Sequence, residues 1–249
     1  MKTRQKSHAE AARTRIVDVH SHILPGIDDG SRNVEESINL LEQLKSQGID
    51  TVTATPHFYP SEQDLSSFLE KRQAAYEKLK ENYPSNLPDI RLGAEVLYYN
   101  GISRMKELAK LCTERTDFLL LEMPSTSWSD YMVREVTEMS RCLSMTVMLA
   151  HFERYLSSQS AQSWESLLQS GVLLQSNADF FLNFGTKRRA MRFLSDETIF
   201  LIGSDCHRID RRFPRMGEAI AQIERKLGKP AIERLERNCD VYLKESLKV

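Results

Sequence analysis

Short apolar runs alternate with helical patterns along most of this chain, and this alternation restricts the fold more than any other feature. The runs have the length and composition of buried parallel strands. We predict seven strands: Ile16–Val19, Thr51–Ala54, Ile90–Val96, Phe118–Leu121, Thr146–Ala150, Val172–Gln175 and Ile199–Gly203. Strands that alternate with helices favour a βα barrel over a fold in which strands and helices are segregated.

Residues at helical spacing fill the intervals between these strands. After the first strand, Asn33 is the expected N-cap of a helix that stops at Gly48. The other expected helices are Ser61–Asn82, Asp130–Leu143, Ser163–Ser170, Lys187–Leu194, Met216–Leu227 and Pro230–Lys244. Because 249 residues suit a single barrel, we predict one α/β domain over residues 16–249, preceded by a polar tail over residues 1–15.

Five of the six histidines follow the apolar runs closely. A lone histidine is more often a packing residue than a ligand, but recurrence at one topological position favours a metal site. Six of the seven predicted strands end at candidate ligands, namely His20, His22, His57, Glu95, Glu122, His151, Asp205 and His207. Since functional side chains of βα barrels project from the carboxyl ends of strands, we expect these side chains to meet at one mouth. The turn at Asp28 and Asp29 adds either a further oxygen ligand or ordinary turn residues.

The donor types indicate the chemistry. Imidazoles and carboxylates without thiolates suit Mn, Fe, Co or Zn. The candidates outnumber what one ion uses, so we predict two or three divalent metals, with Glu95 and Asp205 as the natural bridges. Such a centre hydrolyses a phosphoester or an amide. Arg154 and Arg212 flank the metal motifs and favour a phosphoryl group over an uncharged amide.

The motifs together resemble a known family. They are Asp18-Val19-His20-Ser21-His22, Asp28-Asp29-Gly30, Thr55-Pro56-His57, Gly93-Ala94-Glu95, Leu121-Glu122, Ala150-His151-Phe152-Glu153-Arg154-Tyr155 and Ser204-Asp205-Cys206-His207. This set resembles the polymerase-and-histidinol-phosphatase (PHP) superfamily. Within it, the set is most similar to the manganese-dependent protein-tyrosine phosphatases of bacterial capsule and exopolysaccharide synthesis. The resemblance runs in order from about Ile16 to the end of the chain.

The resemblance implies a distorted (β/α)7 TIM-like barrel that holds three metals, with manganese expected ahead of Fe, Co or Zn. Its implied ligands are His20, His22, Asp29, His57, Glu95, Glu122, His151, Asp205 and His207, with catalytic roles for Arg154 and Arg212. The implied substrates are phosphotyrosines of bacterial tyrosine kinases that control polysaccharide export. Our own mechanistic expectation is hydrolysis by metal-bound hydroxide, without a covalent intermediate. Arg211 departs from the family, where glycine is typical, and the loops after His57 and Glu122 diverge.

Other functions stay open. Within the same superfamily, histidinol-phosphate phosphatases and exonucleases use similar ligands. A net charge of −1 disfavours nucleic acid, although residues 187–192 form a basic stretch that is usually a solvated helix face. A regulatory protein with purely structural metals would need fewer ligands. Cys206 and Arg212 have the C-x5-R spacing of cysteine-dependent phosphatases, but the residues between them are bulky and include no glycine.

Composition suggests a compartment. Four cysteines without C-x-x-C spacing, in a chain too large to need disulfides, indicate reduced thiols. The apolar runs are too short to cross a bilayer. We therefore expect a cytoplasmic enzyme that is not inserted in a membrane, and the sequence leaves its oligomeric state open.

Overall fold

The computed structural model describes residues 15–81, 83–143 and 145–244. Its strands are β1 (Asp18–Ser21), β2 (Thr51–Ala54), β3 (His57–Phe58), β4 (Asp89–Leu92), β5 (Glu95–Leu97), β6 (Phe118–Glu122), β7 (Thr146–Leu149), β8 (Leu173–Asn177) and β9 (Leu201–Gly203). They form a three-stranded sheet, β1-β2-β4, and a six-stranded sheet, β3-β5-β6-β7-β8-β9. Every strand pair is parallel, so all carboxyl ends lie at one edge.

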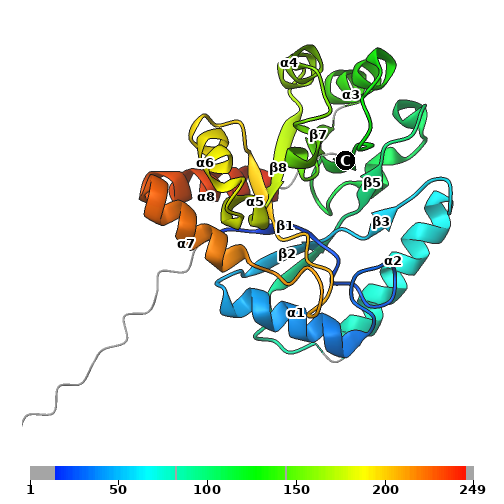
Figure 1. Ribbon diagram of the computed structural model, residues 1–249. Helices are drawn as coiled ribbons and strands as arrows, with labels where there is room; N and C mark the ends of the chain where they lie inside the picture. Colours follow the sequence, from blue (N-terminus) through cyan, green and yellow to red (C-terminus); the bar gives the residue numbers. More distant parts are fainter. Residues whose placement is uncertain (1–14, 82, 144, 245–249) are drawn as a thin grey trace, which may run out of the picture.

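The strands follow a curled course in Figure 1, and the two sheets approach each other near the ends of β1 and β9. An isolated parallel bridge joins Ser21, at the end of β1, to Cys206, just beyond β9. The amide of His22 donates to the carbonyl of Cys206 at 2.9 Å, and the amide of Asp205 donates to the carbonyl of His20 at 2.8 Å. The fold is therefore an α/β domain with a curled parallel sheet.

Helices surround the curled sheet in Figure 1. They are α1 (Val34–Ser46), α2 (Leu65–Lys80), α3 (Asp130–Cys142), α4 (Ala161–Gln169), α5 (Ala178–Leu182), α6 (Lys187–Ser195), α7 (Met216–Leu227) and α8 (Lys229–Leu243), with 3-10 turns η1 (Ile102–Arg104), η2 (Leu108–Leu111) and η3 (Phe152–Tyr155). The predicted Asn33 cap is confirmed, because its side chain accepts the amide of Glu36. Among the described helices, none is both long and apolar enough to span a bilayer.

One strand prediction was wrong in detail, and one strand was missed. The expected strand Ile90–Val96 is broken between β4 and β5, which belong to different sheets. The guanidinium of Arg72 donates to the carbonyl of Gly93 at 2.7 Å, which draws this carbonyl to α2 at the break. The short strand β3 was not expected. It is separated from β2 by Pro56, which has no amide to continue the ladder.

The ends of the chain and of α2 also differ from expectation. The expected helix Ser61–Asn82 begins at Leu65, because the side chain of Asp64 accepts the amide of Ser67 and caps the helix there. Its expected end, Asn82, lies outside the described residues, as do residues 1–14 of the predicted tail. Arg15, the last residue of that tail, pairs with Asp240 on α8 at 3.2 Å.

Candidate metal centre

Glu95 is the centre of a cluster of histidines at the carboxyl edge of the sheet. Its Oε2 lies 3.2 Å from Nε2 of His20, 3.3 Å from Nε2 of His22 and 3.0 Å from Nδ1 of His57. Its Oε1 lies 2.8 Å from Nε2 of His151. These side chains come from β1 and the residue directly after it, from β3, β5 and the turn after β7, so residues distant in sequence meet at one carboxylate.

The centre is buried and electrostatically polarised. Glu95, His20 and His22 are each at most 1% exposed. Burial opposes ionisation of Glu95, but the neighbouring histidines outweigh it and hold the pKa of Glu95 well below its ordinary value. Burial likewise opposes protonation of His22, yet Asp28 and Glu95 hold its pKa well above the ordinary value.

Two buried atoms in this cluster lack hydrogen bonds. Oε2 of Glu95 and Nδ1 of His57 have no hydrogen-bond partner among the described residues, although they lie 3.0 Å apart. Buried polar atoms are normally satisfied. Three overlapping groups here have ligand atoms that all lie within 4.8 Å of one another: His22-Asp29-His57-His207, His20-His22-Glu95 and His57-Glu95-Glu122. The donor set and the unsatisfied atoms fit divalent metals.

The two aspartates of the turn take different positions. Oδ2 of Asp28 lies 2.8 Å from Nδ1 of His22 and accepts the amide of His57 at 3.1 Å. Asp29 is 54% exposed and places Oδ1 at 3.4 Å from Nε2 of His57 and 3.3 Å from Nε2 of His207. Asp29 therefore faces the donor cluster, whereas Asp28 orients the ring of His22 and binds the backbone of His57.

Asp205 links the donor cluster to both predicted arginines. Its Oδ1 lies 3.6 Å from Nε2 of both His20 and His22, and 3.4 Å from the guanidinium of Arg212. Arg154 forms a short ion pair with its Oδ2. Burial opposes ionisation of Asp205, but His20 and Arg154 hold its pKa below the ordinary value. Two guanidinium groups thus lie at the edge of the donor cluster.

Glu122 and His207 lie at the periphery of the cluster. Glu122 is 20% exposed, with Oε1 at 3.6 Å from Nε2 of His151. Burial and the charge of Glu95 raise the pKa of Glu122 to about 7. Burial and the neighbouring His22 lower the pKa of His207 to about 4. The structure therefore brings all eleven predicted site residues to one edge of the sheet, the nine predicted ligands together and the two arginines beside them.

Sequence reasoning missed the residues that support these donors. Gln175 on β8 accepts the amide of His151 at 2.7 Å and contacts Nδ1 of His20 at 3.2 Å. Asn177, two residues later on the same face, donates to Asp205 at 2.8 Å. The available signal was this polar i, i+2 pair at the end of an apolar run. Histidines are oriented by such partners in metal sites.

Aromatic residues near the mouth have different surroundings. Trp128 is 7% exposed, and its indole donates to the carbonyl of Pro124 at 2.9 Å, so it is a packing residue. Tyr98 is buried and donates to Glu135 at 2.7 Å. Tyr59 stacks on the ring of His57 at a centroid distance of 4.9 Å and lies beside the donor cluster.

Cys206 does not have the surroundings of a catalytic thiol. Its side chain is completely buried at the junction of β1 and β9. Burial and the carboxylate of Asp18 raise the pKa of the Cys206 thiol. A nucleophilic cysteine needs a lowered pKa and access to substrate. The C-x5-R match is therefore accidental.

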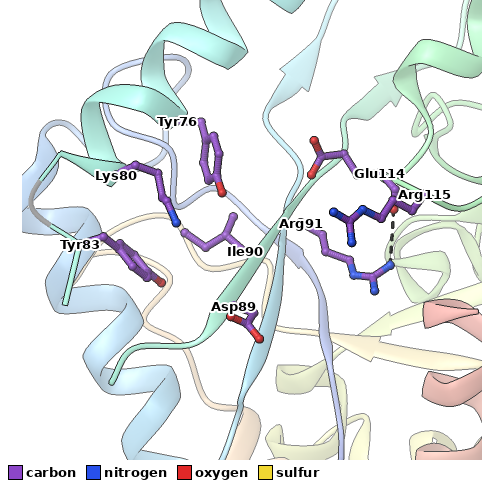
Figure 2. Close-up of a pocket in the computed structure, with 8 residues that line it drawn as sticks. All are labelled: Tyr76, Lys80, Tyr83, Asp89, Ile90, Arg91, Glu114 and Arg115. Carbon is purple, nitrogen blue, oxygen red and sulfur yellow. Dashed lines mark hydrogen bonds between the residues drawn. The ribbon is translucent and has the colours of Figure 1, made fainter. Parts of the chain in front are cut away.

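A separate pocket of about 480 Å³ lies at the opposite end of the strands (Figure 2). Asp89 begins β4 there, and Glu114 precedes β6. The Nζ of Lys80 lies 5.8 Å and 5.4 Å from the ring centroids of Tyr76 and Tyr83. None of the predicted site residues lines this pocket, so it is distinct from the candidate metal centre.

Comparison with known proteins agrees with this arrangement. The family model described as "Capsular polysaccharide synthesis, CpsB/CapC" matches residues 16–243. The tyrosine-protein phosphatase CpsB of Streptococcus agalactiae serotype III is 28% identical over 240 residues, which cover 88% of this chain and 94% of the relative. The tyrosine-protein phosphatase YwqE of Bacillus subtilis is 27% identical over 247 residues, which cover 92% of each chain.

The fold has a solved counterpart. A chain from the crystal structures of YwqE from Bacillus subtilis and CpsB from Streptococcus pneumoniae, described as unique metal-dependent tyrosine phosphatases, superposes with a TM-score of 0.76 at 23% identity. The superposition covers 94% of this chain and 96% of that chain. The family match spans nearly the whole described chain. The chain therefore belongs to the CpsB/CapC family of capsular polysaccharide synthesis.

Proposed function

We propose that this chain is a metal-dependent protein-tyrosine phosphatase, acting on phosphotyrosines of a bacterial tyrosine kinase that controls polysaccharide export. The observation that carries the proposal is the convergence of five histidines and four carboxylates, with two arginines beside them, at one edge of the sheet. The curated relatives named tyrosine-protein phosphatases support the substrate class.

The proposed ligands are His20, His22, Asp29, His57, Glu95, Glu122, His151, Asp205 and His207. They would hold two or three divalent ions, because imidazole and carboxylate donors without a thiolate suit Mn, Fe, Co or Zn. Manganese is proposed ahead of the others because of the resemblance to the manganese-dependent phosphatases. When bound, such ions lower the pKa of water and neutralise charge on a phosphoryl group.

The arginines would position the phosphoryl group. Arg154 and Arg212 both point at Asp205, so an anion bound beside this carboxylate would meet two guanidinium groups. Guanidinium groups bind phosphate oxygens in a bidentate manner and stabilise the charge that develops on them. Tyrosinate has a pKa of about 10 and leaves without strong general-acid help. The covalent cysteine route has no support, because Cys206 is buried.

We also infer that the curled sheet is a distorted seven-stranded barrel. Residues 55 and 56 link β2 to β3, and residues 93 and 94 link β4 to β5. The amide of Gly93 donates to the carbonyl of Ala54 at 2.8 Å, and that of Glu95 to Pro56 at 3.1 Å. We therefore count β2 and β3 as one strand of the barrel, and β4 and β5 as another. The bridge from Ser21 to Cys206 supports closure of this barrel between β1 and β9.

A cytoplasmic location is part of the proposal. None of the four cysteines forms a disulfide, which fits a reducing compartment. The substrate segment of a kinase would then have to be accessible from the cytoplasm.

The test is turnover by metal-stripped protein, with and without added Mn, on a phosphotyrosine peptide, histidinol phosphate and single-stranded DNA. We expect Mn-dependent turnover that is selective for the peptide. Arg154→Ala should lower kcat by about 10²–10³-fold, whereas Arg134→Ala, an exposed arginine of α3, should not. Selective turnover of histidinol phosphate or DNA would overturn the substrate assignment.

A further inference from the structure

A basic groove lies between α6 and α7, the helices coloured yellow and orange in Figure 1. It encloses about 760 Å³. Four cations line it, Lys187 and Arg188 from α6 and Arg225 and Lys226 from α7, and no carboxylate does. In a chain of net charge −1, this groove is a local concentration of positive charge.

These four cations do not form ion pairs with carboxylates of the described residues. On α7, the carboxylate of Glu218 pairs with Arg215 at 2.8 Å, and Arg215 also pairs with Asp179 at 3.1 Å. Among the described residues, none of the four groove cations forms an ion pair. The groove therefore presents unneutralised cations to whatever enters it.

An aromatic side chain stands at the rim. Phe184 is 88% exposed, whereas the next most exposed large apolar residue described, Val241, is 53% exposed. The Nζ of Lys187 lies 5.0 Å from its ring centroid. Met191 and Leu227, both partly buried, add apolar lining. The groove thus combines cations with an apolar and aromatic surface, which suits a segment that carries both carboxylates and aromatic rings.

A protein segment fits better than a bilayer or a nucleic acid. The apolar residues Ala190 and Leu194 of α6 are buried inside the protein, so this helix has no apolar face left to insert into lipid. Phe184 is a single ring, whereas single-stranded nucleic acids are bound by aromatic platforms that stack successive bases. The surface is also hollow rather than flat.

Only a short stretch of sequence separates the groove from the residues that support the metal centre. Asn177, which donates to Asp205, is followed by the five-residue helix α5 and then by Phe184 two residues beyond its end. With a helical rise of 1.5 Å per residue inside α5 and 3.8 Å for each of the other steps, the two Cα atoms are at most about 17 Å apart. About five extended residues would span this distance.

We propose that the groove between α6 and α7 docks an acidic, aromatic-containing segment of the phosphoprotein substrate, about five residues from the phosphotyrosine. This proposal rests on the proposed function, because the groove would increase the affinity of the same active site for its protein substrate. Two linked contacts on one chain strengthen binding without any change at the reacting group.

The first experiment measures binding without catalysis, by fluorescence anisotropy with a labelled, unphosphorylated peptide that carries a run of glutamates beside a tyrosine. We expect binding that weakens with added salt, and weakens at least tenfold in the double variant Arg225→Glu/Lys226→Glu and in Phe184→Ala. The matched double variant Lys78→Glu/Arg237→Glu reverses two exposed cations elsewhere and should bind like wild type. Equal loss in both double variants would overturn the proposal, since it would show a general charge effect.

The second experiment measures turnover of phosphotyrosine peptides with the glutamate run about five residues to either side, against versions with glutamine. We expect one glutamate peptide to have a KM at least fivefold lower than its glutamine version, an advantage lost in the groove variants while kcat on free phosphotyrosine is unchanged. Lack of any phosphotyrosine turnover would contradict the proposed function but leave the binding result standing. Groove-dependent binding of anionic vesicles or single-stranded DNA in place of the peptide would overturn the docking proposal.

Discussion

Gln175 provides a test of whether residues behind the donors hold the metal centre in place. It is completely buried on β8. Its Oε1 accepts the amide of His151 at 2.7 Å and contacts Nδ1 of His20 at 3.2 Å, and its Nε2 donates to Asn177 at 3.1 Å. Gln175→Met keeps the length of the side chain and removes all three interactions.

The expected magnitude follows from these contacts. The buried amide of His151 would lose its acceptor, which costs about 1–3 kcal/mol. For a chain of this size, each kcal/mol shifts the Tm by about 2–4 °C, so the metal-free variant should melt about 2–12 °C lower. The ring of His20 would also lose its orienting partner, and such losses reduce metal affinity by about 10–100-fold.

Calorimetry measures both effects. Scanning calorimetry gives the Tm of the metal-free proteins, and titration with Mn gives the affinity. The control is Gln162→Met, which changes an exposed glutamine of α4 in the same way and should leave both values unchanged. If Gln175→Met binds Mn as tightly as wild type and melts at the same temperature, the reasoning about supporting residues is refuted.

Three further substitutions test other parts of the account. Burial alone would raise the pKa of Glu135, but hydrogen bonds to its carboxylate lower it, so Glu135→Gln should reduce the free energy of unfolding by about 1–3 kcal/mol at pH 7. This deficit should shrink in urea melts below pH 4, and a deficit that does not change with pH would contradict the reasoning. Cys206→Ser should keep near-normal metal-dependent turnover, and lost turnover with metal retained would revive the cysteine route. A Cβ on Gly203 would lie 2.5 Å from that of His20, so Gly203→Ala should weaken Mn binding in titration calorimetry, whereas unchanged affinity would show that the strands can adjust.

Much of the fold could be predicted because its signals are local. The predicted bounds of Met216–Leu227 match α7, and the start at Asp130 matches α3. Apolar periodicity and capping residues determine such elements within a few turns of chain. The break inside Ile90–Val96 could not be predicted in this way, because it coincides with a hydrogen bond from Arg72 on a different element.

Part of the candidate site could likewise be predicted from the sequence, and part of it could not. Its donors follow strand ends, so their meeting at one edge follows from parallel topology alone. Which turn aspartate faces the cluster depends on the course of the turn, which places Asp28 against His22 and leaves Asp29 beside His207. The contact between Gln175 and His151 depends on the neighbouring positions of β7 and β8, which the sequence of either strand does not specify.

The central claim is that distant histidines and carboxylates form one multinuclear metal centre around Glu95. Elemental analysis and calorimetric titration with Mn measure this directly, on wild type, Glu95→Gln and the exposed control Glu138→Gln of α3. The account predicts that wild type and control bind two or three Mn ions per chain and that Glu95→Gln loses at least one. Wild-type protein that binds no Mn, or a Glu95→Gln variant with undiminished stoichiometry and affinity, would contradict it.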